Sequence, residues 1–445
     1  MKLPPSSAKI LKKEFANLIS VQDWLFLLSD GHLDDFERLL YEKFMNLYDL
    51  FSEVFISFLS SSQTFNLKQE EKAKELGLSK LELRQVELQL RTGTKIKFKS
   101  LYAKKVPKGY KKDRHLSMLL WKCIKKSSPE YASITTLLSV ICPSFDVAKK
   151  VMLQLGIKAN QERIRTLSLK LATECISHRA KSQIAPNESL EGKRVIIGID
   201  GGRTRTRVYP DPDNVSRNQK YDTPWIEPKL FVIATIDENG KTDKKELPIY
   251  DSTFGDDELF DVLEQYLHKL KIELAESVQI LGDGAPWIWN RAKAMLLQLG
   301  VKNEKITETL DYYHAKEHLT DMMIYVDKDK KEKLLPKFKK AIWEGNIKAL
   351  KRLVKKGIKG VNLDKFTPYN YFLKNKQRID YQSFRKKKYP IGSGIIESGI
   401  RRIINLRFKA PSSFWYPQNV EKLILMRAIA LSGRWNIMQA NLQKI

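Results

Sequence analysis

The sequence contains little cysteine and no long apolar run. Cys123, Cys142 and Cys175 are odd in number and widely spaced, so they form neither a disulfide framework nor a CxxC zinc knuckle. No stretch approaches the roughly 18 uninterrupted apolar residues that span a bilayer. The N-terminal residues also lack the apolar core of a secretory signal. These absences predict buried thiols in a reducing cytoplasm and no membrane partner.

Positive charge is what the sequence has in excess. The 445 residues include 79 Lys and Arg against 52 Asp and Glu, a net charge of +27, and this favours a polyanionic partner. The excess is concentrated, because residues 327–390 hold 21 Lys and Arg and only six Asp and Glu, or +15. A charge focused in this way is more typical of a surface that contacts a phosphate backbone than of general solubility.

The length predicts two or three domains, of which residues 1–190 are expected to form a mainly α-helical, DNA-binding region. Periodic apolar residues indicate helices over residues 1–65, and the polar stretch 68–90 has helical propensity. Residues 88–106 alternate around a Thr-Gly-Thr turn and predict a hairpin. Residues 144–175 form two helical segments around a glycine-containing turn. This pattern indicates either a helix-turn-helix, whose second helix enters a major groove, or a plain helical hairpin.

A polar stretch, residues 177–193, is expected to be a linker, and the chain changes character after it. Three apolar strand candidates come first, followed by helices and strands in alternation. This order predicts a mixed-sheet α/β domain over residues 191–445. The lysine-rich segment at about 320–389 is expected to be a basic helical insertion in that domain.

Three carboxylates stand at positions that favour a shared site. Asp200 ends the apolar run VIIGI and Asp283 ends QILG, and each is followed by glycine, which allows a sharp turn. Two strands of one sheet would then present both at the edge where α/β sheets hold ligands. Ser393 can cap a helix beginning near Gly394, so that Glu397 lies in its first turn, where the helix field favours a carboxylate.

Gathered carboxylates repel one another unless cations lie between them. Two Mg²⁺ ions, or Mn²⁺, held by Asp200, Asp283 and Glu397 would remove the repulsion. One ion would activate a water or a 3′-hydroxyl, and the other would stabilise the leaving oxygen. A single Asp at a strand end is more often a turn or cap residue. Three carboxylates in this order instead predict phosphodiester cleavage.

The motifs around these residues, VIIGIDGGRTR, ILGDGAPWIW and YPIGSGIIESGIRRIINLRFK, resemble the catalytic domain of DDE transposases of bacterial insertion sequences. They stand where that family carries its first Asp, second Asp and final Glu, over about residues 190–435. Asp311-Tyr-Tyr-His314 resembles a signature of Mutator-like members, in which the His lies near the active site and supports DNA handling. By this resemblance Asp311 supports the site and His314 contacts DNA.

The resemblance implies a ribonuclease H-like core with a helical insertion before Glu397. It also implies metal-dependent strand cleavage and strand transfer at the ends of an insertion sequence. The implied partners are double-stranded DNA, both transposon ends and target, and further copies of the chain, in a homodimer or higher oligomer within a synaptic complex. The implied location is the bacterial cytoplasm, in association with the nucleoid.

Basic residues follow two of the carboxylates. Arg203 comes soon after Asp200, and strand alternation would place it on one face with Arg205 and Arg207. For each of them the alternative to a DNA contact is a solvated surface.

Further DNA contacts are expected near the C-terminus and in the insertion. Arg401 lies four residues after Glu397, on the same face of an α-helix, and Lys409 follows; both are expected to contact phosphates. Trp343 could stack on an unpaired base beside the cleavage site. Packing within a helical bundle is the alternative for this tryptophan.

Four other functions fit parts of the sequence. Gly198–Thr204 resembles a phosphate loop of sugar kinases and actin-like ATPases, but only a short basic tail follows Glu397, where a kinase needs a second nucleotide-binding half. His314–His318 matches the HxxEH pattern of zinc peptidases, which explains neither the charge nor the carboxylates. A metal-dependent nuclease of the same fold, or an inactive DNA-binding derivative of a transposase, remains open.

Overall fold

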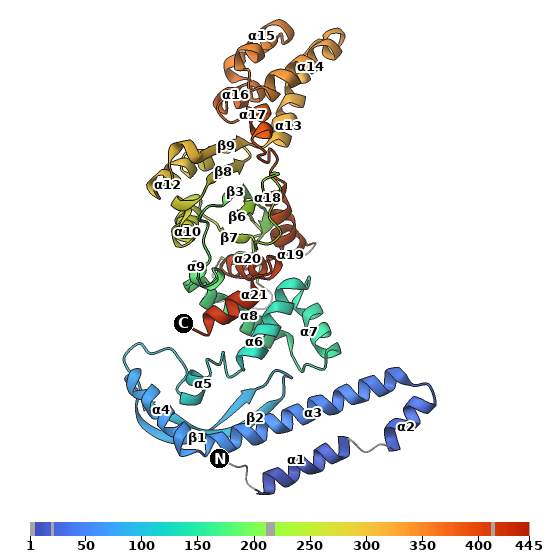
Figure 1. Cartoon of the computed structure of the whole chain (residues 1–445), viewed down its shortest axis with the longest axis vertical. Helices are drawn as coiled ribbons and strands as arrows, with labels where there is room; N and C mark the ends of the chain where they lie inside the picture. Colours follow the sequence, from blue (N-terminus) through green and yellow to red (C-terminus); the bar gives the residue numbers. More distant parts are fainter. Residues whose placement is uncertain (1–4, 19–21, 211–218, 411–413, 445) are drawn as a thin grey trace. The chain divides into compact units, whose positions relative to one another are not determined.

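The computed structural model forms two compact units, Met1–Thr173 and Glu174–Ile445. The contact boundary falls inside helix α8 (Gln161–Ser177), earlier than the boundary expected at residue 190. Among the described residues, no helix is both long and apolar enough to cross a membrane. The structure (Figure 1) describes residues 5–18, 22–210, 219–410 and 414–444.

The N-terminal unit combines helices with one β-hairpin. Its core includes the hairpin residues Val86, Leu88, Ile96 and Phe98, which pack with Met118. The elements are α1 (Pro5–Leu18), α2 (Gln22–Ser29), α3 (Leu33–Ser60), α4 (Gln63–Glu75), β1 (Ser79–Gln89), β2 (Lys95–Lys105), α5 (Leu116–Leu120), α6 (Pro129–Ile141), α7 (Phe145–Gln154) and α8.

The hairpin prediction is confirmed, whereas the helix predicted across residues 68–90 is wrong for its second half. Helix α4 ends at Glu75, and residues 79–89 form β1, paired antiparallel with β2. Glutamates suggested a helix, but on β1 they pair with lysines across the hairpin: Glu87 lies 2.7 Å from Lys95, and Glu82 also pairs with Lys104. Such pairing stabilises a strand and is invisible to local propensity.

The two helices predicted over 144–175 are present as α7 and α8. They pack with α6 around a core of buried side chains, so their apolar faces are used within this unit. Whether α8 enters a DNA groove stays a prediction. The core residues are Tyr131, Met152, Ile157, Ile164 and Leu167.

The second unit contains a five-stranded mixed sheet of order β7-β6-β3-β8-β9. β3 pairs antiparallel with β6 and parallel with β8, and β8 pairs parallel with β9. Helices flank the sheet on both sides (Figure 1), which is why every residue of β6 is buried. This mixed α/β arrangement is consistent with a ribonuclease H-like core. The strands are β3 (Arg194–Gly201), β6 (Lys229–Ile236), β7 (Ile249–Thr253), β8 (Ser277–Gly282) and β9 (Ile306–Leu310).

Several helices pack against the strands of this sheet. Helix α10 contacts β6 and β7, α18 contacts β3 and β6, and α20 contacts β7. A short ribbon, β4 (Thr204–Arg205) with β5 (Trp225–Ile226), lies after β3. The helices around the core are α9 (Arg179–Gln183), α10 (Asp256–Lys269), α11 (Pro286–Trp289), α12 (Ala292–Gln298), α18 (Gly394–Gly399), α19 (Leu406–Phe408), α20 (Pro417–Leu431) and α21 (Trp435–Leu442).

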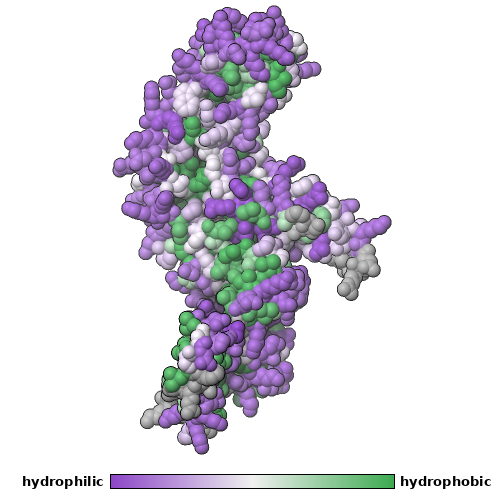
Figure 2. Space-filling view, turned by 90° about the vertical axis from the view of Figure 1, so that its right-hand side faces the viewer, coloured by the Kyte–Doolittle hydropathy of each residue, from purple (hydrophilic) through white to green (hydrophobic). Residues whose placement is uncertain are grey.

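A helical segment follows edge strand β9 and returns to the sheet before α18. Its outer surface over α14 and α15 is mostly hydrophilic (Figure 2). Of the Lys and Arg between residues 327 and 390, every one except Arg378 is exposed. The helices are α13 (Tyr312–Met323), α14 (Lys328–Trp343), α15 (Ile347–Gly357), α16 (Thr367–Lys374) and α17 (Tyr381–Lys386).

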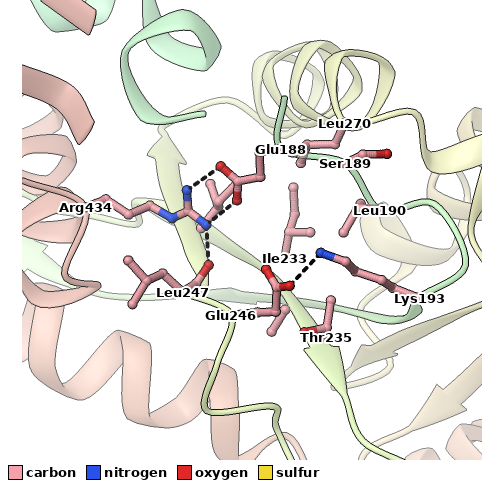
Figure 3. A pocket seen from close by; sticks show the side chains of 12 residues that line it. Glu188, Ser189, Leu190, Lys193, Ile233, Thr235, Glu246, Leu247, Leu270 and Arg434 are labelled. Carbon is pink, nitrogen blue, oxygen red and sulfur yellow. Dashed lines mark hydrogen bonds and ion pairs between the residues drawn. The ribbon is translucent and has the colours of Figure 1, made fainter. Parts of the chain in front are cut away.

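The stretch predicted to be a linker, residues 177–193, is instead part of the second unit. Glu188 pairs with the buried Arg434 (Figure 3). The Arg434 guanidinium also donates to the backbone carbonyls of Gln183 and Pro248, each at 2.9 Å. The cavity beside this pair measures about 20 Å³, which is room for about one water molecule. The segment looked like a linker because its polar residues find their partners far along the chain.

Replacing Arg434 should unfold this unit at lower denaturant. Arg434→Met leaves the Glu188 carboxylate and several carbonyls unpaired in a buried place, at a cost of about 3–5 kcal/mol. The matched control is Lys193→Met. It breaks the half-exposed Lys193–Glu246 pair of the same pocket (2.7 Å) and should cost no more than about 1 kcal/mol. Equal midpoints for the two variants in urea denaturation would contradict this account.

Candidate functional site

Three aspartates lie at the same level on adjacent parallel strands. Gly198 of β3 pairs with Leu281 of β8, so two residues further along this register Asp200 stands level with Asp283. Gly282 of β8 pairs with Leu310 of β9, which places Asp311 level with Asp283. Parallel pairing therefore brings all three to the carboxyl edge of the sheet.

Asp200 is largely buried, and its charge is poorly solvated. Its Oδ1 accepts a hydrogen bond of 2.7 Å from the Gly201 N–H. The pKa of Asp200 is raised from 3.8 to about 6, mainly by burial and also by the negative charges of Asp283 and Glu397, while the Gly201 N–H and His314 act in the opposite direction. Like charges close to a buried carboxylate favour the protonated form or a bound cation.

Asp283 is held by the turn that follows β8. Its Oδ1 accepts from the Ala285 N–H at 2.9 Å, and its backbone carbonyl accepts from the Tyr371 hydroxyl at 2.9 Å. Gly284 has φ +94°, and a Cβ there would lie 2.7 Å from the Tyr371 ring. Glycine is therefore required both for the left-handed turn and for the approach of the tyrosine.

Asp311 is fully buried and caps helix α13. Its carboxylate accepts from the His314 N–H at 2.8 Å and from the Ser393 N–H. The first bond is an N-cap, which fixes the three-residue spacing of Asp311 and His314. The second attaches the segment before α18 to the end of β9.

Glu397 lies in the first turn of α18, which begins at Gly394 as predicted. Ser393 occupies the cap position, but its hydroxyl donates to the Glu397 carboxylate instead of accepting from the backbone. The Glu397 N–H donates to the Ser393 carbonyl at 2.9 Å. Glu397 is exposed.

One group at this edge has ligand atoms spaced as a metal site requires. Atoms of Asp311, His314 and Glu397 all lie within 4.8 Å of one another. Burial lowers the pKa of His314, but the charges of Asp311, Glu317 and Asp283 outweigh it and raise the pKa overall. The prediction from sequence grouped Glu397 with Asp200 and Asp283 and gave Asp311 and His314 other roles. The N-cap pattern Asp-x-x-His before a helix was the signal available for this group.

Helix α18 packs closely against β3, and this brings Glu397 to the edge of the sheet. A Cβ on Gly198 would lie 2.9 Å from Val232 Cγ1 and 3.1 Å from Ile396 Cβ. A Cβ on Gly202 would lie 2.7 Å from Ile404 Cδ1. The absence of side chains at two glycines therefore sets how near the helix with Glu397 approaches the sheet.

The other predicted contacts lie on the surface around the site. Arg203 and Arg205 are exposed and alternate with buried residues, whereas Arg207, expected on the same face, is half-buried. Lys409 is exposed, 6.0 Å from the Trp225 ring centroid. Arg401 is exposed as well, but the helix becomes a π-helix at Ile400.

The π-helix changes one expectation. The same-face relation of Arg401 to Glu397 assumed an α-helix, and the α-helical period does not continue past Ile400.

Trp343, expected to stack on a base, is half-buried against Tyr312 and Tyr381, with ring centroids at 5.5 and 6.3 Å. This packing favours the structural alternative for the tryptophan.

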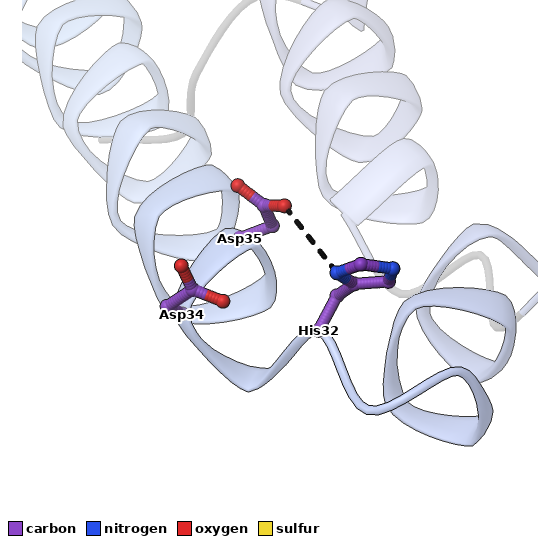
Figure 4. A group of neighbouring side chains, drawn as sticks. All are labelled: His32, Asp34 and Asp35. Atoms are coloured by element: carbon purple, nitrogen blue, oxygen red, sulfur yellow. Dashed lines mark ion pairs between the residues drawn. The ribbon is translucent and has the colours of Figure 1, made fainter.

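A second group with ligand spacing lies in the N-terminal unit, at His32, Asp34 and Asp35 (Figure 4). His32 and Asp34 are exposed, and Asp35 already pairs with Arg38 and with His32. This group of His32, Asp34 and Asp35 lacks the buried carboxylate that distinguishes the group around Asp311.

Comparison with known proteins gives little guidance. No family model and no curated protein sequence matches the chain. The chain is similar to a solved structure, the Drosophila P element transposase strand transfer complex, at 12% identity over 73% of this chain and 84% of that chain. The TM-score is 0.23, so the similarity establishes neither family nor function.

Crowding Gly198 should displace Glu397. Gly198→Ala forces Val232 or Ile396 to move and should cost about 1–3 kcal/mol of stability, seen as a lower melting temperature. Gly394→Ala is the matched control, because a Cβ there meets nothing within 4 Å, and it should melt at or above wild type. Equal melting of both variants would show that the close approach is not required.

Asp200→Asn should stabilise the metal-free protein at neutral pH. The pKa of Asp200 is about 6 in the folded chain against 3.8 ordinarily, so the native state binds the proton more tightly. The stability that this proton provides is present below pH 4 and is lost as pH rises to about 6. In EDTA at pH 7.5 the variant should be more stable by about 1–3 kcal/mol, with the gain vanishing near pH 4. A gain that does not depend on pH would contradict this assignment.

Proposed function

We propose that this protein is a DNA transposase that cleaves and joins DNA strands at the ends of an insertion sequence in a metal-dependent reaction. The observation that supports this most is the register that places Asp200 level with Asp283 on adjacent parallel strands. Burial raises the pKa of Asp200, and the charges of Asp283 and Glu397 raise it as well. Such a repulsive group is suited to divalent cations and unsuited to structural hydrogen bonding.

The donor set fits a divalent metal. Asp200, Asp283 and Glu397 would hold Mg²⁺ or Mn²⁺, two ions per site, and Asp311 with His314 adds ligands at the same edge. When bound, such ions activate a water or 3′-hydroxyl and stabilise the leaving oxygen. The chain itself contributes orientation, because each aspartate is fixed by a backbone N–H from its own turn.

DNA as the substrate is supported by the exposed cations of residues 327–390. Their lysines and arginines are solvent-facing with the exception of Arg378, so the +15 charge of this segment lies at the surface. Such a surface binds a phosphate backbone without reading sequence. The proposal includes transposon ends and target DNA, held by at least two copies of the chain.

The geometry favours this function over two of the others. His318 of the peptidase-like pattern stacks on Tyr371, with ring centroids 3.7 Å apart. Among the described residues, the ligand-spaced group pairs His314 with Asp311 and Glu397 and does not include His318. A kinase needs a duplicated core, and the part of the chain that the structure describes contains one sheet of five strands.

The test uses purified full-length protein and labelled duplexes carrying the DNA that flanks its gene. With Mg²⁺, wild type should nick or cut at the element ends and join them to a target duplex. Asp200→Asn, Asp283→Asn and Glu397→Gln should each lose at least about 100-fold in rate while DNA affinity stays within about threefold. Asp321→Asn, an exposed carboxylate on α13, is the control.

Three results would change the proposal. Cleavage without strand transfer would indicate a nuclease of the same fold. DNA binding without cleavage in Mg²⁺ or Mn²⁺ would indicate an inactive derivative. Full activity of any one of the three variants would remove that residue from the site.

A further inference from the structure

The N-terminal unit contains a basic cavity that the catalytic site does not involve. Its volume is about 210 Å³, enough to admit a phosphate group. The charged side chains that line it come from the hairpin, from the turn before α6 and from the start of α8: Glu87, Lys95, Lys125, Lys126 and Arg163.

Two of these lysines adopt an unfavourable backbone conformation. Lys125 and Lys126 have φ of 52° and 60°. They are the central residues of a tight turn, in which Ile124 and Ser127 exchange backbone hydrogen bonds of 3.0 and 2.9 Å. Glycine and asparagine are the residues preferred at both central positions of such turns. The two lysines therefore hold a conformation that glycine or asparagine adopts more easily, and the exchanged hydrogen bonds fix the turn in it.

The rest of the unit holds this turn in place. The Gln89 N–H donates to the Lys126 carbonyl at 2.9 Å, and the Arg163 guanidinium donates to the Lys125 carbonyl. Arg163 also reaches Ser127 Oγ at 2.7 Å and Gln89 Oε1 at 3.1 Å. Both turn carbonyls are therefore engaged, and the two exposed lysines line the cavity.

The cavity has more positive charge than its own carboxylate neutralises. Glu87 is paired with Lys95 at 2.7 Å, which leaves Lys125, Lys126 and Arg163 against no further carboxylate in the lining. The Asn160 side-chain oxygen, which also lines the cavity, accepts from the Arg163 N–H at 2.7 Å. A ligand for this cavity must be an anion with several acceptor oxygens.

We propose that this cavity binds a phosphate group, and that the phosphate is a phosphodiester of duplex DNA. A DNA source is favoured by the exposed lysines that line the cavity and by the net charge of the chain, since a backbone phosphate is approached from outside a protein. The site would position DNA on the N-terminal unit without reading bases. It does not depend on the catalytic carboxylates, and it can be tested without metal or cleavage.

The test compares the Lys125→Gly/Lys126→Gly double variant with Lys122→Gly in the full-length chain. Lys122 also has a positive φ, 51°, but it does not line the cavity. Glycine suits the left-handed conformation, so both variants should melt at or above the wild-type temperature. The Lys125→Asn/Lys126→Asn variant serves as a second version, because asparagine also tolerates this conformation.

Binding is measured in EDTA with a labelled 20-base-pair duplex of random sequence at several salt concentrations, and with inorganic phosphate by calorimetry at constant ionic strength. The double variant should bind the duplex more weakly, with a salt slope shallower by about 0.9 per lost phosphate contact, and Lys122→Gly should match wild type. Loss of inorganic phosphate binding with an unchanged DNA slope would assign the cavity to a free phosphate compound and overturn the DNA source. Wild-type behaviour of the double variant in both assays would overturn the site. Cleavage is not read in either assay, so these outcomes leave the proposed function to its own test.

Discussion

The register of three parallel strands holds three carboxylates close together, and the arrangement of the second unit around this edge accommodates their mutual repulsion. Asp200, Asp283 and Asp311 occupy the same level of β3, β8 and β9, and strands fixed by backbone hydrogen bonds cannot separate to relieve their charge. Each carboxylate accepts an N–H from its own turn or helix. The fold thus satisfies each group singly. Burial raises the pKa of Asp200, the charges of Asp283 and Glu397 add to this shift, and a proton or a cation would relieve it.

The same edge is where the chain must return after a long helical segment. Several polar contacts guide that return along β8 and β9. The Gln279 amide donates to the Pro390 carbonyl at 2.7 Å, and the Tyr312 N–H donates to the Ile391 carbonyl at 2.9 Å. Arg378 forms a largely buried ion pair with Glu308 at 3.1 Å. Together with the Ser393–Asp311 bond they deliver Glu397 to the sheet, so the insertion is attached at its base and exposes its cations elsewhere.

What the sequence predicted correctly was local. Apolar runs that end in Asp-Gly identified the strand ends at Asp200 and Asp283, and the serine before Gly394 identified the start of α18. The errors concern partners that are distant in sequence. Residues 79–89 were assigned to a helix because cross-strand pairing with lysines cannot be read locally, and the stretch around Glu188 was assigned to a linker because Arg434 lies far along the chain. The π-helix after Ile400 left no sequence signal that we can name.

The roles of Asp311, His314 and Glu317 follow from the geometry of one helix end. Asp311 uses two acceptor positions on backbone N–H groups, and a carboxylate has about four, so it retains capacity for a further ligand. His314 Nδ1 lies 3.1 Å from Glu317 Oε2, which leaves Nε2 as the ring nitrogen for a metal. A carboxylate on the opposite nitrogen orients a ligating imidazole and raises its basicity. Under the proposed function Glu317 orients His314, and the ligands at this edge come from three strand ends and two helix starts.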